Sequence, residues 1–215
     1  AVIGLALFAM FFGAGNLIFP PVLGQMAGEN ISWGMLGFCL SGVGFPLLGV
    51  LTMAMKQSDN PDSIAMPMHP LYARAVTILC ALAIGPLFAI PRTAAVSFDT
   101  GIHSLLPASC ETIGLPVYTV FFFVLTYFFS INPSKIIGHI GKFLSPMLLI
   151  CLAVLVVCVF VNPTGSLKMP NPDFAASPFF RGFQEGYNTM DLLAAILFGS
   201  ITIKAIEAQG ITDKK

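Results

Sequence analysis

Residues 1–28 form a long apolar run without any Asp, Glu, Lys or Arg, and this run is interrupted at its centre. Its length suffices to cross a bilayer, which takes about 20 apolar residues. However, Gly13, Gly15 and a following proline pair weaken a helix, and Asn16 brings an amide into an apolar environment. Irregular backbone at membrane depth is tolerated only where protein covers it or a cavity lies beside it. We therefore predict a discontinuous membrane helix whose freed N–H and C=O groups could bind a ligand or an ion.

The composition is that of an integral membrane protein. Hydrophobic residues make up 56 % of the 215 residues and charged residues 9 %, whereas soluble domains carry about 25 % charged residues. The net charge of zero argues against nucleic-acid binding, which needs a basic surface. The first apolar run lacks a basic n-region and is too long for a cleavable signal peptide. Because the sequence has no initiator Met and stops soon after a membrane segment, we expect a piece of a longer protein.

The pattern of apolar stretches predicts an all-α integral membrane protein with six transmembrane helices. The longest connection, residues 162–186, carries four prolines, so we expect an ordered or interfacial loop there without a long helix. The predicted membrane segments cover residues 2–23, 31–55, 72–95, 116–131, 137–161 and 187–206.

The distribution of basic residues predicts the orientation in the membrane. Connections on one side hold seven Lys and Arg residues and those on the other side hold three, so the richer side should be cytoplasmic. The first and sixth segments are then antiparallel, and both are interrupted. Interrupted segments at corresponding positions of two inverted repeats indicate the binding site of a secondary transporter. We expect a five-helix repeat over residues 1–162, an extracytoplasmic loop over 163–186, and the first helix of a truncated second repeat over 187–215.

The residues Gly13, Ala14, Gly15 and Asn16 are the first candidates for a binding site. An unwound stretch presents N–H groups to a carboxylate and C=O groups to a cation, and half-helix ends add their dipoles. Alternatively, the small residues form a close helix-packing face, as they often do in membranes. The combination with Asn16 and the prolines favours the functional interpretation.

Asp191 is the second candidate, because burying a charge in a membrane segment is expensive and an ionisable residue there is usually functional. It could face a cation or carry a proton itself. Alternatively, Asp191 lies near the outer interface, where it is hydrated, or it caps a half-helix. Thr189 and Tyr187 offer hydroxyl groups to a substrate or an ion, although helix-packing hydrogen bonds would explain them almost as well.

Arg92 follows Pro91 near the end of the third segment. It could pair with Asp191, meet a substrate carboxylate or act as a gate, but a side chain that reaches the outer interface is the simpler expectation. The five cysteines show no CxxC spacing, and the three histidines lie far apart. The sequence therefore indicates neither a disulfide framework nor a metal site, and no nucleophile–base pair of an enzyme is visible.

Three blocks of the sequence resemble a known family, the branched-chain amino acid carriers of bacteria (BrnQ-type, LIVCS family). They are FFGAGNLIFPPVLGQMAG at residues 11–28, AIGPLFAIPRTAAVSFDTGI at 83–102, and EGYNTMDLLAAILFG at 185–199. The resemblance covers essentially the whole chain. It implies sodium-coupled, or alternatively proton-coupled, import of leucine, isoleucine and valine across the bacterial inner membrane, without a cofactor. It also implies the inverted-repeat fold of LeuT-like transporters, of which this chain would be the first half.

The resemblance assigns roles to individual residues. The backbone at Gly13, Ala14, Gly15 and Asn16 would bind the carboxylate of the amino acid, with Tyr187 and Thr189 on the opposite side of the pocket. Sodium would bind at Gly13, Asn16, Thr189 and Asp191. Two alternatives stay open: a proton-coupled carrier of another neutral solute that works through Asp191, and a fragment that does not transport.

Overall fold

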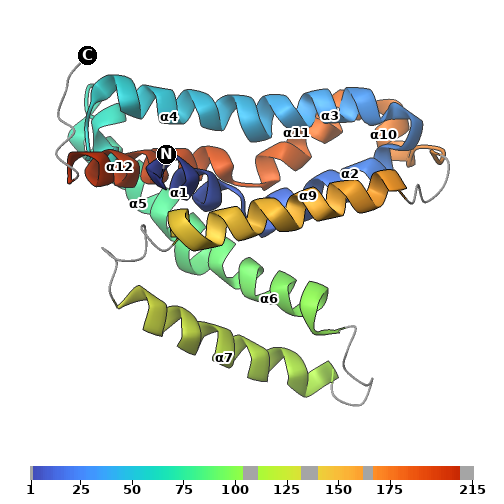
Figure 1. The fold of residues 1–215 in the computed structure, drawn as a ribbon. Helices are drawn as coiled ribbons and strands as arrows, with labels where there is room; N and C mark the ends of the chain where they lie inside the picture. The colour runs from blue at the N-terminus through green and yellow to red at the C-terminus, as the bar shows by residue number, and fades with distance from the viewer. Residues whose placement is uncertain (1, 104–110, 132–139, 162–166, 209–215) are drawn as a thin grey trace.

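The structure is a computed structural model, and it describes residues 2–103, 111–131, 140–161 and 167–208. The regular elements of these residues are all helical (Figure 1). The α-helices are α1 (Val2–Phe11), α2 (Ala14–Ala27), α3 (Ile31–Cys39), α4 (Phe45–Lys56), α5 (Pro70–Leu82), α6 (Ala89–Gly101), α7 (Glu111–Ser130), α9 (Ser145–Val161), α10 (Pro172–Ala176), α11 (Pro178–Asn188) and α12 (Asp191–Glu207). The short 3₁₀ helices η1 (Gly28–Asn30) and η3 (Pro61–Ile64) lie between them. The π-helical turns adjoin α-helices: η2 (Leu40–Gly44), η4 (Ala83–Leu87) and η7 (Ile140–Leu144).

Five helical stretches among the described residues are long and apolar enough to cross a membrane, which confirms a multi-pass, all-helical membrane protein. They are Gly15–Lys56, Pro70–Gly101, Ile113–Ser130, Lys142–Val161 and Pro178–Glu207. The expected number of six differs because the first predicted segment is not one long helix. Its α1 part has ten residues and is about 15 Å long, half of the hydrocarbon thickness.

The stretch Gly15–Lys56 reverses direction at η1, where α2 meets α3 (Figure 1). A Cβ atom on Gly34 would lie 3.4 Å from the Leu23 side chain and 3.5 Å from that of Ala27, so the two helices pack as an antiparallel hairpin. Gly28 sits at the turn with a φ of +50°, a left-handed conformation that suits glycine. Leu23 and Ala27 are fully buried there, together with Phe38 and Phe174.

The most extensive helix–helix contact joins α3 to α11, and it is a seam of glycines. Gly182 on α11 faces Gly34 on α3, and Gly37 on α3 faces the α11 backbone between Phe179 and Phe183. These glycines are buried, as is Gly186 further along α11. A Cβ atom on Gly182 would overlap the backbone of Gly34. In a membrane, where lipid tails are as apolar as leucine, such small residues let helices approach closely enough for strong dispersion contact. The seam therefore fixes α11 against the α2–α3 hairpin.

The connection 163–186 differs from the expected loop. It contains α10 and most of α11. α11 is eleven residues long and begins at Pro178. Proline is compatible with this position because the first N–H groups of a helix have no intrahelical acceptor. The expectation that this connection has no long helix is therefore wrong. The division of the chain into two repeats stays a prediction.

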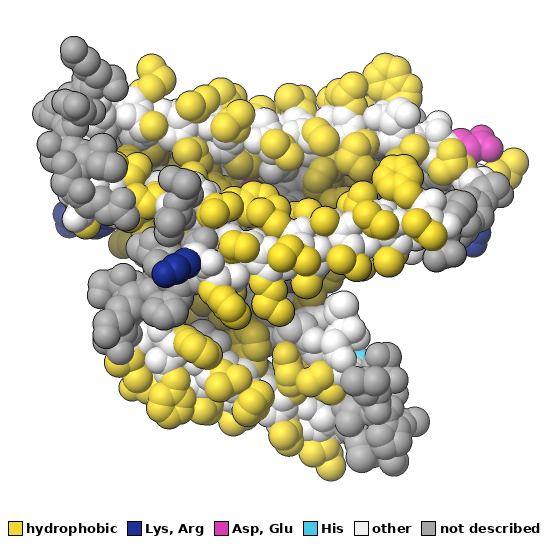
Figure 2. Space-filling view, viewed as in Figure 1, with side chains coloured by type: hydrophobic (Ala, Val, Ile, Leu, Met, Phe, Trp, Pro, Cys, Tyr) yellow, Lys and Arg dark blue, Asp and Glu magenta, His cyan; other side chains and the backbone are white. Residues whose placement is uncertain are grey.

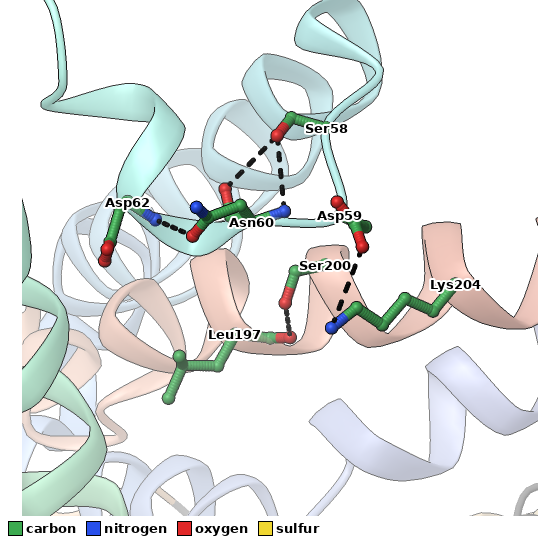
Figure 3. A network of polar contacts seen from close by, with 7 residues as sticks. All are labelled: Ser58, Asp59, Asn60, Asp62, Leu197, Ser200 and Lys204. Carbon is green, nitrogen blue, oxygen red and sulfur yellow. Dashed lines mark hydrogen bonds and ion pairs between the residues drawn. The ribbon is translucent and has the colours of Figure 1, made fainter.

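A polar connection holds α12 to the segment between α4 and α5 (Figure 3). The Lys204 Nζ atom lies 3.8 Å from Asp59 Oδ2, and Asn60 Oδ1 accepts a hydrogen bond of 2.9 Å from the Asp62 N–H at the start of η3. The contact places Lys204 at the same end of the bundle as Lys56, the last residue of α4.

Hydrophobic side chains cover most of the face shown in Figure 2. Large apolar residues on α7 and α9 are exposed; the Phe160 ring, for example, is 82 % exposed. A surface of this kind is costly in water and is expected where lipid or further helices cover it. α9 itself is attached to α1 by the buried Ser145, whose hydroxyl donates a 2.8 Å hydrogen bond to the Leu5 carbonyl.

Candidate functional site

The chain leaves helical geometry between α1 and α2, at Phe12 and Gly13. Gly13 has extended dihedral angles (φ −107°, ψ −171°), and α2 starts at the next residue. The Asn16 side-chain amide donates a 2.6 Å hydrogen bond to the Phe11 carbonyl, one of the groups left without a helical donor where α1 ends. The amide that made this segment unusual in sequence thus stabilises the end of α1. The proline pair lies inside α2 and does not end it.

A second interruption separates α11 from α12. Met190 adopts a left-handed conformation with a φ of +65°, which is uncommon for a residue with a side chain and marks a sharp change of direction. The preceding Thr189 is buried, and its hydroxyl donates a 2.7 Å hydrogen bond to the Gly186 carbonyl. α12 then begins with Asp191, whose negative charge is favourable at the positive end of the helix dipole.

Arg92, on α6, reaches the second interruption. Its Nη1 donates a 2.8 Å hydrogen bond to the Asn188 carbonyl, and its Nη2 donates one of 3.2 Å to the Thr189 carbonyl. The guanidinium also lies 5.5 Å from the centre of the Phe19 ring on α2, within cation–π range. The polar end of Arg92 is therefore bonded to protein groups, and its position relative to the outer interface stays a prediction.

The two interruptions and Arg92 line one half-open cavity of about 220 Å³. The volume is below the roughly 300–1,000 Å³ of sites for drug-sized ligands and suits a small solute. Asp191 lines this cavity together with Asn16, Thr189 and Arg92, so a carboxylate and a guanidinium share it. The lining residues are Met10, Phe11, Gly13, Gly15, Asn16, Ile84, Ala89, Ile90, Arg92, Thr93, Thr189, Met190, Asp191, Ala194 and Phe198.

A larger and mainly apolar cavity, of about 570 Å³, lies between α1 and the α3–α4 segment. Phe8, Phe12, Phe38 and Val50 contribute to its walls. Phe11, Asn16 and Asp191 line both cavities, so these three residues lie between a charged compartment and an apolar one. An amphipathic solute with a charged end and an apolar end would match such an arrangement.

The structure brings most of the predicted site residues together, and their roles stay predictions. Gly13, Gly15, Asn16, Arg92, Thr189 and Asp191 share the smaller cavity. Ala14 is the first residue of α2, and its side chain lies outside the described part of the structure. Tyr187 is 53 % exposed and is not among the lining residues. Thr93 and Met190 also line the cavity and were not predicted from the sequence. Thr93 directly follows Arg92 and could have been included on that ground, whereas nothing in the sequence signals the left-handed backbone of Met190.

Comparison with known proteins agrees with the resemblance of the three sequence blocks. The family model described as "Branched-chain amino acid transport protein" matches residues 1–215. The branched-chain amino acid permease BrnQ of Bacillus subtilis is 44 % identical over 214 residues, which cover 100 % of this chain and 49 % of the permease. BraB of the same organism is 42 % identical over 100 % of this chain and 48 % of BraB, and BrnQ of Escherichia coli is 38 % identical over 99 % of this chain and 48 % of that permease.

No solved structure matches the chain. The chain spans about half the length of the curated relatives named above. The match to the family model nevertheless extends over the full sequence, and the identities to the relatives are well above the level at which chance similarity is a concern. The chain therefore belongs to the branched-chain amino acid transport protein family.

Proposed function

We propose that this chain is the first half of a secondary transporter that imports leucine, isoleucine and valine by sodium-coupled symport across a bacterial inner membrane. The names of the relatives support the substrate class, and the half-length match supports the assignment as one part of a longer protein. Transport requires no covalent chemistry, so the protein would not be an enzyme. The driving energy would come from the ion gradient, to which each translocated charge contributes about 2.3 kcal/mol per 100 mV.

The observation that carries the proposal is that both helix interruptions lie at one cavity with opposite charges. The first N–H groups of α2 have no intrahelical acceptor and lie at the positive end of the helix dipole, so they suit a carboxylate. Asp191 suits the ammonium group of the amino acid or a sodium ion. The apolar cavity beside Asn16 has room for a branched side chain.

The same pair of interruptions supports the LeuT-like, inverted-repeat architecture. In such carriers the discontinuous helices hold substrate and ion near the middle of the membrane, and one helix bundle rocks against the other. Here the α1–α2 and α11–α12 interruptions take the places of the discontinuous first and sixth helices. Binding of sodium and substrate would stabilise the closed arrangement around Asn16 and Asp191.

The test is uptake of labelled leucine into cells that lack their own carriers, in sodium buffer and in choline buffer. The 215-residue chain is compared with the longest reading frame that contains it. We expect sodium-dependent uptake by the longer protein and none by the chain alone. Uptake by the short chain would contradict its role as an incomplete half. A well-expressed longer protein that takes up no leucine would refute the proposed substrate.

Proton coupling through Asp191 is the second candidate, and it is supported by the position of this carboxyl group between the two cavities. Replacing Asp191 by Asn removes the titratable group and keeps its shape. Under proton coupling, Asp191→Asn abolishes the pH dependence of uptake; under sodium coupling, it weakens the sodium dependence instead. The exposed Glu207→Gln variant, at the end of α12, is the matched control and should change neither. An unchanged sodium requirement in Asp191→Asn would exclude this carboxylate as a sodium ligand.

A further inference from the structure

The carbonyl groups at the end of α11 are already occupied by a cation that belongs to the protein. A helix that ends leaves its last carbonyls without N–H donors, and such carbonyls are ligands for cations. At the α11–α12 interruption, the Asn188 and Thr189 carbonyls instead accept the two hydrogen bonds from Arg92, of 2.8 and 3.2 Å. The positive charge therefore lies where the negative end of the α11 dipole is exposed.

The position of the guanidinium is fixed from several sides. The Phe19 ring lies 5.5 Å from its central carbon. A Cβ atom on Gly15 would lie 3.5 Å from Nη2, so the backbone of α2 borders the group directly. Asp191, the first residue of α12, lines the same cavity as Arg92 and carries the opposite charge. Arg92 thus connects α6 to α2 and to the end of α11, within the interrupted segment Pro178–Glu207.

We propose that the Arg92 guanidinium is a built-in cation of the α11–α12 interruption, which fills the place that a dissolved cation would otherwise take at the Asn188 and Thr189 carbonyls. Arg92 is then a positioning residue: it holds Met190 and Asp191 toward the cavity before any substrate binds. A coupling ion would bind on the Asn16–Asp191 side of the cavity and not at these two carbonyls. The statements on uptake rest on the proposed transport function, whereas those on stability do not.

The choice of arginine has a physical reason. Its planar fork presents two N–H groups at once and so bridges the carbonyls of two consecutive residues. The ammonium group of a lysine carries the same charge, but it is compact and strongly hydrated. It would bind one of these carbonyls well but would not bridge both. We therefore expect that a lysine at position 92 does not fully replace the arginine, although both carry a positive charge.

The experiment uses the full-length protein, purified in detergent without leucine, and measures its melting temperature. The variants are Arg92→Ala and Arg92→Lys, with Arg181→Ala as the matched control, because Arg181 forms a partly exposed pair with Asp173 on the surface. Each is measured with millimolar guanidinium and, at equal ionic strength, with tetramethylammonium. We expect a lowered melting temperature for Arg92→Ala that guanidinium raises and tetramethylammonium does not. Arg92→Lys should be intermediate, and the wild type and Arg181→Ala should not respond.

An Arg92→Ala protein that is as stable without leucine as the wild type would overturn the proposal. The same holds if guanidinium does not stabilise it. Loss of only the leucine-induced stabilisation would show instead that Arg92 binds the substrate carboxylate. Should Arg92→Ala fail to fold, Arg92→Lys decides, and wild-type stability of that variant contradicts the role of the fork.

Uptake gives an independent readout. We expect leucine uptake to fall at least about tenfold in Arg92→Ala and to recover in part with guanidinium; tenfold corresponds to about 1.4 kcal/mol. If the wild type takes up no leucine while guanidinium still stabilises Arg92→Ala, the proposed function fails and the built-in cation stands. If the wild type transports leucine and Arg92→Ala is as stable as the wild type without substrate, the proposal of a built-in cation is refuted and the proposed function stands.

Discussion

Replacing Gly182 by alanine is the sharpest test of the seam between α3 and α11. The new Cβ atom would lie 2.6 Å from the carbonyl carbon of Gly34 and 2.8 Å from its Cα, whereas ordinary van der Waals contact begins at 3.4 Å. The obstacle is backbone and not the end of a flexible side chain, so the two helices must move apart. No substitution at Gly34 can remove its backbone atoms, and a second-site rescue at that position is excluded.

The expected cost follows from the separation. Moving packed surfaces apart by about 0.5–1 Å forfeits roughly a quarter to a half of their dispersion attraction. Overpacking of a core costs about 1–3 kcal/mol, and we expect Gly182→Ala to lie at the upper end, about 3 kcal/mol, because the seam is the most extensive helix contact of the described residues.

The free energy of unfolding of the full-length protein, measured by titration with denaturing detergent, checks this value. Gly101→Ala is the matched control. Gly101 is the last residue of α6, and a Cβ atom added to it would meet no other atom within 4 Å. It should be neutral. Ordinary surface substitutions change the free energy of unfolding by up to about 0.5 kcal/mol. If the free energies of unfolding of the two variants differ by less than this, α3 and α11 do not approach each other as closely as described.

Two smaller effects are expected elsewhere and use the same unfolding titration. Ser41→Ala removes the 2.7 Å hydrogen bond from its hydroxyl to the Phe183 carbonyl across the seam and should cost about 0.6–1 kcal/mol, as interhelical hydrogen bonds in membranes do; a neutral result would show that the serine contributes by its size alone. Lys204→Ala removes the 3.8 Å ion pair with Asp59, in which both side chains are more than half exposed, and should cost less than about 1 kcal/mol. A larger loss would mean that this pair is shielded from water in the full-length protein.

Local sequence patterns predicted the helices and six of the fifteen residues that line the smaller cavity. The uncharged run of residues 1–28 predicted membrane helix, and the glycines in it predicted a change of backbone conformation that the structure places at Phe12 and Gly13. Asn16 and Asp191 stood out because polar groups in apolar segments are expensive unless they have partners. These are properties of a residue and its neighbours in sequence, and they need no knowledge of the fold.

The misjudged features depend on partners that are distant in sequence. The two acceptors of Arg92 were not predicted, and they lie 96 and 97 residues further along the chain. The prolines of residues 162–186 suggested an irregular connection, but Pro178 is harmless as the first residue of α11. The glycine seam between α3 and α11 was not predicted from the sequence either. A glycine indicates that another helix can approach closely, but it does not indicate which helix does so.

The sequence by itself therefore determined the membrane environment, the helical class, the position of the first interruption and the family, because hydropathy, backbone propensity and sequence similarity are local or additive quantities. Only the tertiary structure decided that the two interruptions face one cavity, that Arg92 bonds the second of them, and that Tyr187 is exposed and does not line the cavity. These facts follow from the glycine seam and the helix reversal at η1, which bring distant segments together, and contact across such distances leaves no mark in either segment alone.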